Sequence, residues 1–180
     1  MREYYQQLIT ASQLANVLNT SADSVVVLDA SIAPIAGMTE PEKKWPNTVI
    51  KGAKRFDLEG DFSDQQSDLP HSLPSNAQFN EQVKKLGIDD DTQVVIYDHF
   101  GIFSSARAWW MFKAMGHERV AVLDGGLPLW LSLKLPVEVA QVSSAPKLGN
   151  FIGRLDRLSF CNADAVKTAL ENRQKTVLDA

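Results

Sequence analysis

Residues able to act as nucleophiles or acids are few and widely spaced in this sequence. Asp98 directly follows the apolar run Val94–Tyr97, and open α/β sheets bind ligands beyond the carboxyl ends of their strands. A helix N-terminus after that strand would present backbone N–H groups, which suit an anion or a thiolate. An aspartate nucleophile in phosphoryl transfer would also need Mg²⁺ and partner carboxylates, and His99–Phe103 contains no second acid. We therefore interpret Asp98 as a structural residue that caps its loop.

The other candidate residues predict no metal or cofactor site. Cys161 is the single cysteine, which excludes an internal disulfide and a multi-cysteine metal site. The histidines His71, His99 and His117 are scattered along the chain, so a metal site has little support. The sequence contains none of the glycine-rich nucleotide motifs and no nucleophile motif of the hydrolases.

The elements that must position these residues are predicted by the hydrophobic pattern. Short β-branched runs alternate with helical stretches, which indicates an α/β sheet covered on both faces, and the fully apolar strands suit a parallel sheet. The predicted strands lie at 25–28, 49–58, 92–98 and 119–124, and the predicted helices are one capped by Thr10, one capped by Ser75 or Asn76, 104–115, 128–133 and one capped by Asn162.

The sequence predicts one domain and part of another. A chain of 180 residues suits one ordinary domain with a remainder. The regular pattern loosens between residues 134 and 158, which is typical of a linker. We predict a domain at 1–140, an interdomain linker at 141–160, and the first helix and strand of a second domain at 161–180.

An internal repeat supports this organisation. The text "VLDA" occurs at 27–30 and again at 177–180, and each copy follows a helical pattern with matching apolar positions. Two similar helix–strand units could also arise by chance. Two homologous domains, of which the second has only begun, explain the repeat better.

Charge and hydropathy limit the partners of the chain. The formal net charge is −4, so no overall basic field exists to attract nucleic acid or an anionic membrane surface. The sequence has neither a signal-peptide pattern at its start nor the roughly 18 apolar residues that a membrane span requires. We expect a cytoplasmic protein without nucleic-acid or membrane partners.

Two segments carry a resemblance to a known family. Ile96–Trp130 resembles the first domain of tandem rhodanese-type sulfurtransferases, and Arg55–Pro74 resembles a loop of the 3-mercaptopyruvate sulfurtransferase branch. The resemblance implies a rhodanese-like three-layer α/β/α fold with a mainly parallel central sheet. In that family the second domain carries the catalytic cysteine at the position of Asp98, and the first domain is silent. The resemblance therefore implies no catalytic residue in this chain, and Cys161 lacks the glycine-rich loop that follows the family's nucleophile.

The resemblance also implies roles for three residues. Arg107 matches an arginine that holds the substrate carboxylate, although a surface arginine in an ion pair is the plainer interpretation. His71 matches a histidine beside the active site that orients substrate or transfers a proton, and an ordinary loop histidine is the alternative. Glu59 matches an acid that partners this histidine, but one residue is inserted after it.

The implied function is that of the N-terminal part of a sulfurtransferase. The complete enzyme would take sulfur from 3-mercaptopyruvate or thiosulfate onto a cysteine as a persulfide and pass it to cyanide or a thiol. The missing partner of this chain would be the second rhodanese domain, and no cofactor would be needed. The 180-residue chain alone would be inactive. The alternative is a stand-alone, non-catalytic rhodanese-like module with a binding or regulatory role.

Overall fold

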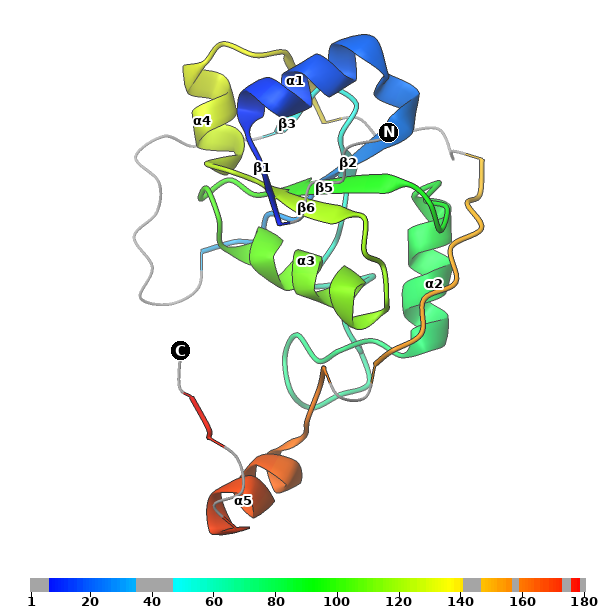
Figure 1. Ribbon diagram of the computed structural model, residues 1–180, viewed down its shortest axis with the longest axis vertical. Coiled ribbons are helices and arrows are strands. Elements are labelled where there is room, and N and C mark those ends of the chain that lie inside the picture. Colours follow the sequence, from blue (N-terminus) through cyan, green and yellow to red (C-terminus); the bar gives the residue numbers. More distant parts are fainter. Residues whose placement is uncertain (1–6, 35–46, 141–146, 157–158, 173–175, 179–180) are drawn as a thin grey trace.

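A parallel sheet between two layers of helices forms the body of the protein, in a computed structural model that describes residues 7–34, 47–140, 147–156, 159–172 and 176–178 (Figure 1). The elements are β1 (Leu8–Ile9), α1 (Ala11–Thr20), the 3-10 helix η1 (Ala22–Ser24), β2 (Val25–Asp29), β3 (Thr48–Ile50), β4 (Lys54–Arg55), α2 (Asn76–Lys85), β5 (Gln93–Tyr97), α3 (Ser104–Ala114), β6 (Val120–Leu123), α4 (Gly126–Ser132), β7 (Val137–Val139) and α5 (Ala163–Asn172).

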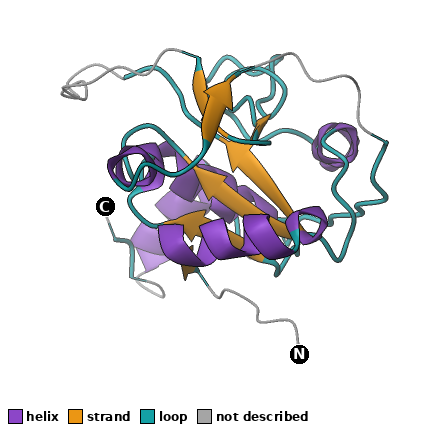
Figure 2. Cartoon of the chain, turned by 90° about the horizontal axis from the view of Figure 1, so that it is seen from above, coloured by secondary structure: helices purple, strands orange, loops and turns teal. Residues whose placement is uncertain are grey.

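The central sheet has five parallel strands in the order β1-β6-β5-β2-β4. Successive side chains of a strand point to opposite faces of the sheet, so one strand contributes to the hydrophobic core on each face. In β5, Val94 and Ile96 pack with α2 and α3, whereas Val95 and Tyr97 pack with α1 and α4. Figure 2 shows the same strands from above with the helices around them. The predicted three-layer α/β/α class with a mainly parallel sheet is confirmed.

The predicted helix caps are confirmed. The Thr10 hydroxyl accepts from the backbone N–H of Gln13 in a capping box, and the Ser75 hydroxyl accepts from the backbone N–H of Gln78. Asn162 caps α5, because its side-chain oxygen accepts the backbone N–H of Ala165 at 2.9 Å. These local hydrogen bonds satisfy N–H groups that a helix start leaves without intrahelical partners.

Two short strands were not predicted. β1 joins the sheet edge beside β6, and β7 pairs antiparallel with β3 in a separate two-stranded sheet, with Ile50 opposite Val137. β7 lies at the start of the stretch that the loosened pattern assigned to a linker. Strands of two or three residues carry too little alternation to be recognised, and they form because a partner strand lies beside them.

Residues 147–156, which we call the strap, run along α2 (Figure 1). They contain no helix or strand, as a linker predicts, but they are firmly bound to the domain. Asn80 exchanges two hydrogen bonds with the backbone of Gly153, and the Gly149 N–H donates to the carbonyl of Lys84. The side chain of Phe151 is 1% exposed. The strap is therefore attached to the first domain, with Phe151 in its core, while the boundary at residue 140 stays a prediction.

His117 is a buried titratable group beneath the strap. Its ring lies 5.6 Å from that of Phe112 and 5.5 Å from that of Phe151, and its Nε2 is 3.0 Å from the carbonyl oxygen of Thr92. Burial lowers the pKa of His117 below its ordinary value of 6.5. The neutral imidazole is therefore the form that the fold stabilises.

We expect the free energy of unfolding to fall as pH is lowered from 7 to 5. The unfolded chain binds a proton at His117 near its ordinary pKa, and the folded chain does so only at lower pH, so acidification favours unfolding by up to about 1.4 kcal/mol per pH unit. Urea unfolding at several pH values measures this slope. The His117→Gln variant should show a shallower slope, and equal slopes would contradict the assignment.

The second copy of the internal repeat is present as a helix. α5 and its cap Asn162 match α1 and its cap Thr10, each shifted by 152 positions. α5 lies apart from the three layers and has no buried side chain (Figure 1). Thr176–Leu178 form no strand, and the other residues of the predicted strand lie outside the described residues. No described helix is long and apolar enough to cross a membrane.

Candidate functional site

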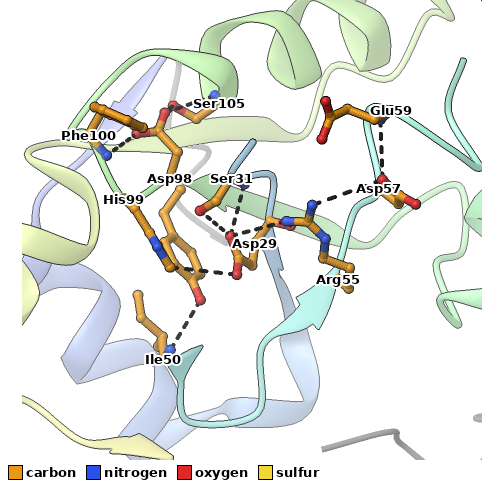
Figure 3. A network of polar contacts seen from close by, with 11 residues as sticks. Asp29, Ser31, Ile50, Arg55, Asp57, Glu59, Asp98, His99, Phe100 and Ser105 are labelled. Carbon is orange, nitrogen blue, oxygen red and sulfur yellow. Dashed lines mark hydrogen bonds and ion pairs between the residues drawn. The ribbon is translucent and has the colours of Figure 1, made fainter. Parts of the chain in front are cut away.

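The carboxylate of Asp98 is enclosed by its own loop, residues 98–105, which we call the Asp98 loop (Figure 3). One oxygen accepts the N–H of Phe100 at 2.7 Å. The other accepts the N–H groups of Phe103 at 2.7 Å and Ser105 at 2.9 Å, and the Ser105 hydroxyl at 2.6 Å. The residue is 0% exposed. Asp98 therefore caps its loop, as the sequence predicted, and its carboxylate also accepts the N–H of Ser105 at the start of α3. Neither oxygen is free to attack a substrate.

A pair of glycines supports the Asp98 loop from the next strand. Gly125 and Gly126 have φ angles of +71° and +50°, which matches the predicted tight turn. A Cβ on Gly126 would lie 2.5 Å from the carbonyl oxygen of Asp98, and the N–H of Leu127 donates to the same oxygen at 3.0 Å. Close backbone contact between the two turns therefore requires glycine at this position.

Arg107 and His71 come together in a pocket of about 390 Å³, which we call the arginine pocket. The Arg107 side chain extends from α3, and its Nη2 donates to the backbone carbonyl of His71. His71 has a φ of +55°, in the left-handed region. The residues that line the pocket are His71, Ser72, Leu73, Pro74, Arg107, Trp110, Leu155 and Phe160.

The guanidinium of Arg107 has one buried hydrogen-bond donor without a partner. Its Nε is buried and has no hydrogen-bond partner, and the side chain forms no ion pair among the described residues. Burial lowers the pKa of the guanidinium, because the low dielectric disfavours its charge. A bound carboxylate would supply both the missing acceptor and the missing counter-charge. The ion-pair alternative for Arg107 is thus not observed.

Glu59 is not brought to His71. Among the described contacts, no hydrogen bond or ion pair joins the two side chains, and Glu59 is exposed. Its backbone instead accepts from Gln65 and donates to the carboxylate of Asp57. The predicted pairing of Glu59 with His71 is therefore absent here. Gly60, which follows Glu59, lies in this same turn.

The adjacent tryptophans have different roles, as their 100° separation on a helix predicts. The indole N–H of Trp109 donates to the carbonyl of Val120 at 3.1 Å, so this ring packs on the sheet. Trp110 lines the arginine pocket. Both rings pack against the core, and Trp110 in addition forms part of the pocket wall.

A buried polar cluster around Asp29 was missed by sequence reasoning (Figure 3). One carboxylate oxygen accepts the N–H and the hydroxyl of Ser31, at 2.9 and 2.5 Å. Arg55 lies 3.8 Å from the same carboxylate and His99 lies 3.9 Å from it. Arg55, from the neighbouring strand β4, places a guanidinium beside this carboxylate. The position of Asp29 at the end of its strand was the only signal in the sequence.

Comparison with known proteins gives a consistent result. Residues 10–133 match the family described as Rhodanese-like domain. The human protein named 3-mercaptopyruvate sulfurtransferase is 35% identical over 178 residues, covering 96% of this chain and 59% of that protein. An Arabidopsis thaliana protein named thiosulfate/3-mercaptopyruvate sulfurtransferase 1, mitochondrial, is 43% identical over 120 residues, covering 67% of this chain and 31% of that protein.

A solved structure agrees with the sequence comparisons. The 3-mercaptopyruvate sulfurtransferase SseA from Escherichia coli superposes with a TM-score of 0.79 at 29% identity, covering 94% of this chain and 63% of that one. The chain thus spans less than two thirds of the length of each of these proteins. Because the family match extends over most of the three-layer body, from the cap of α1 to the end of α4, this chain belongs to the rhodanese-like domain family.

Proposed function

We propose that this chain is the N-terminal, non-catalytic part of a sulfurtransferase. The complete enzyme would take sulfur from 3-mercaptopyruvate or thiosulfate and pass it, through a cysteine persulfide, to cyanide or a thiol. The proposal is supported by relatives named as 3-mercaptopyruvate and thiosulfate sulfurtransferases, of which this chain covers up to about 60% of the length.

The observation that carries the proposal is the contrast between Asp98 and Arg107. At the strand end where the family places its nucleophile, the carboxylate of Asp98 is buried and saturated with hydrogen bonds. In the arginine pocket, Arg107 keeps its buried Nε without an acceptor and forms no ion pair with a described residue. This arrangement can bind an anionic substrate but offers no group to attack it. We assign Arg107 to the carboxylate of the sulfur donor and His71 to its orientation or to proton transfer.

The nucleophile would come from a second rhodanese domain. Cys161 is exposed and precedes α5, and no loop of backbone N–H groups surrounds it in the described structure. A persulfide requires a thiolate that is stabilised by such donors. We therefore assign Cys161 no catalytic role.

The test compares the 180-residue chain with the product of the coding sequence read beyond Ala180. The longer protein should form thiocyanate from cyanide and 3-mercaptopyruvate, while the 180-residue chain should remain at background, with or without Cys161→Ala. In the longer protein, Arg107→Gln should raise KM for 3-mercaptopyruvate about 10- to 100-fold, because a charge-assisted hydrogen bond is lost. A matched control is Arg119→Gln, at the edge of β6 and outside the pocket.

Two outcomes would contradict the proposal. Turnover by the 180-residue chain that Cys161→Ala abolishes would show that the chain is itself an enzyme. A coding sequence that stops near Ala180, together with specific capture of a partner by the chain, would favour the binding module instead.

A further inference from the structure

We infer that Phe160 is a specificity-determining residue, which limits the size of the carboxylate that the arginine pocket accepts. This inference rests on the proposed role of Arg107 in binding a carboxylate. It assigns a selective function to the segment after the strap, which sequence reasoning interpreted only as a linker.

The pocket has one polar end and apolar walls. The polar end consists of Arg107 and the backbone of His71, and the walls are built from three separate segments of the chain. One wall comes from the loop at 71–74 and another from Trp110 on α3. Leu155 and Phe160 supply the third wall.

Phe160 closes the pocket against Trp110. Their ring centroids are 6.3 Å apart with an interplanar angle of 41°, which is a favourable aromatic contact. Phe160 is 47% exposed, so its ring covers the pocket on one side and meets solvent on the other. A ring in this position restricts the pocket without contributing much to the core.

The third wall is held in place by backbone hydrogen bonds of the strap. The N–H of Arg154 donates to the carbonyl of Met115 at 2.9 Å, and the N–H of Asp156 donates to that of Ala114 at 2.8 Å. The N–H of Leu155 donates to the side chain of Asn76 at 3.2 Å. These contacts attach the strap to the end of α3 and the start of α2. Leu155 therefore has a fixed position in the pocket wall.

The pocket's size and composition define the ligand class. A volume of about 390 Å³ lies toward the small end of the range for small-molecule sites, roughly 300 to 1,000 Å³. One guanidinium at the polar end suits a single carboxylate. The apolar walls suit a carboxylate whose remaining part is short and uncharged, such as a small alkyl or thiol group. Short 2-oxo and 2-mercapto carboxylates fit this description.

The test uses pyruvate and phenylpyruvate as probes of the 180-residue chain. Both carry the same 2-oxo acid group, and only phenylpyruvate carries a bulky ring. Binding is followed by NMR of the tryptophan indole signals, since Trp110 lines the pocket. The wild-type chain should bind pyruvate more tightly than phenylpyruvate. The Phe160→Ala variant should shift the ratio of the two dissociation constants at least tenfold in favour of phenylpyruvate, because removing the ring opens the pocket.

Two further variants test whether the change is specific to Phe160 and whether binding depends on Arg107. Ile152→Ala removes an apolar side chain of the strap that is 63% exposed and lies outside the pocket, so it should leave the ratio unchanged. Arg107→Gln should weaken binding of both probes about 10- to 100-fold, so that it is no longer detected at millimolar concentration. Circular dichroism of Phe160→Ala should match that of the wild type, since the removed ring is half exposed.

The outcomes distinguish this inference from the proposed function. If Phe160→Ala leaves the ratio unchanged while Arg107→Gln abolishes binding, the role of Phe160 is wrong and the role of Arg107 stands. If pyruvate binds equally to the wild type and to Arg107→Gln, the proposed substrate role of Arg107 is wrong. If neither probe binds the wild-type chain at millimolar concentration, the inference fails, and the proposed function remains open to the thiocyanate assay.

Discussion

Replacing Asp98 by alanine should lower the free energy of unfolding by about 3–5 kcal/mol, the summed cost of several buried donors that lose a charged acceptor. The N–H groups of Phe100 and Phe103, and both donors of Ser105, depend on this carboxylate. Asp98→Asn should cost less, because the amide retains one acceptor oxygen. Urea unfolding at pH 7, followed by circular dichroism, measures these differences.

Asp124 provides the matched control for this experiment. It also follows a parallel strand of the central sheet, but its side chain is exposed. Asp124→Ala should change the free energy of unfolding by no more than about 0.5 kcal/mol. Equal effects of the two substitutions would contradict the capping role of Asp98. A gain of thiocyanate turnover is not expected in any of these variants, since none supplies a thiol.

Replacing Phe151 by alanine should lower the free energy of unfolding by about 3–5 kcal/mol, as is usual for a buried phenylalanine. Its ring is 6.0 Å from that of Phe79, 6.2 Å from that of Phe112 and 5.5 Å from that of His117. The variant should also release the strap, so the N–H of Gly153 should exchange faster with solvent. Urea unfolding and hydrogen exchange measure the two effects.

Ile152 provides a control that distinguishes the loss of a core contact from a general effect of changing the strap. Ile152→Ala also shortens an apolar side chain, but this side chain is 63% exposed and should cost no more than about 0.5 kcal/mol. Similar losses for the two variants would show that Phe151 does not anchor the strap. Because Leu155 is held by the same segment, Phe151→Ala should in addition weaken ligand binding in the arginine pocket.

The elements with strong local signals were predicted closely. The apolar strand before Asp98 and the helix after it were expected at 92–98 and 104–115, and they lie at Gln93–Tyr97 and Ser104–Ala114. Continuous apolar residues and helical spacing carry this information within a short window. The capping role of Asp98 followed in the same way, since all of its donors lie within seven residues of it.

The predictions that needed distant contacts were incomplete. The strap was interpreted as a linker because its partners lie some 40 to 80 residues away in the sequence, as in the pairs Met115–Arg154 and Asn80–Gly153. The pairing of Glu59 with His71 came from the resemblance, and no described hydrogen bond or ion pair joins their side chains. The expected strand at the end of the repeat is not formed at Thr176–Leu178, where no described strand pairs with it.

By itself, the sequence determined the α/β class, the helix caps, the interpretation of Asp98 as a cap of its loop, and the resemblance to rhodanese-type sulfurtransferases. These depend on residue types and hydrogen bonds close together along the chain. Only the tertiary structure decided that Arg107 keeps an unpaired Nε, that Phe151 draws the strap into the core, and that Phe160 lies against Trp110. The physical reason is that burial and pocket shape arise when distant segments pack together, and no local pattern encodes which side chains will meet.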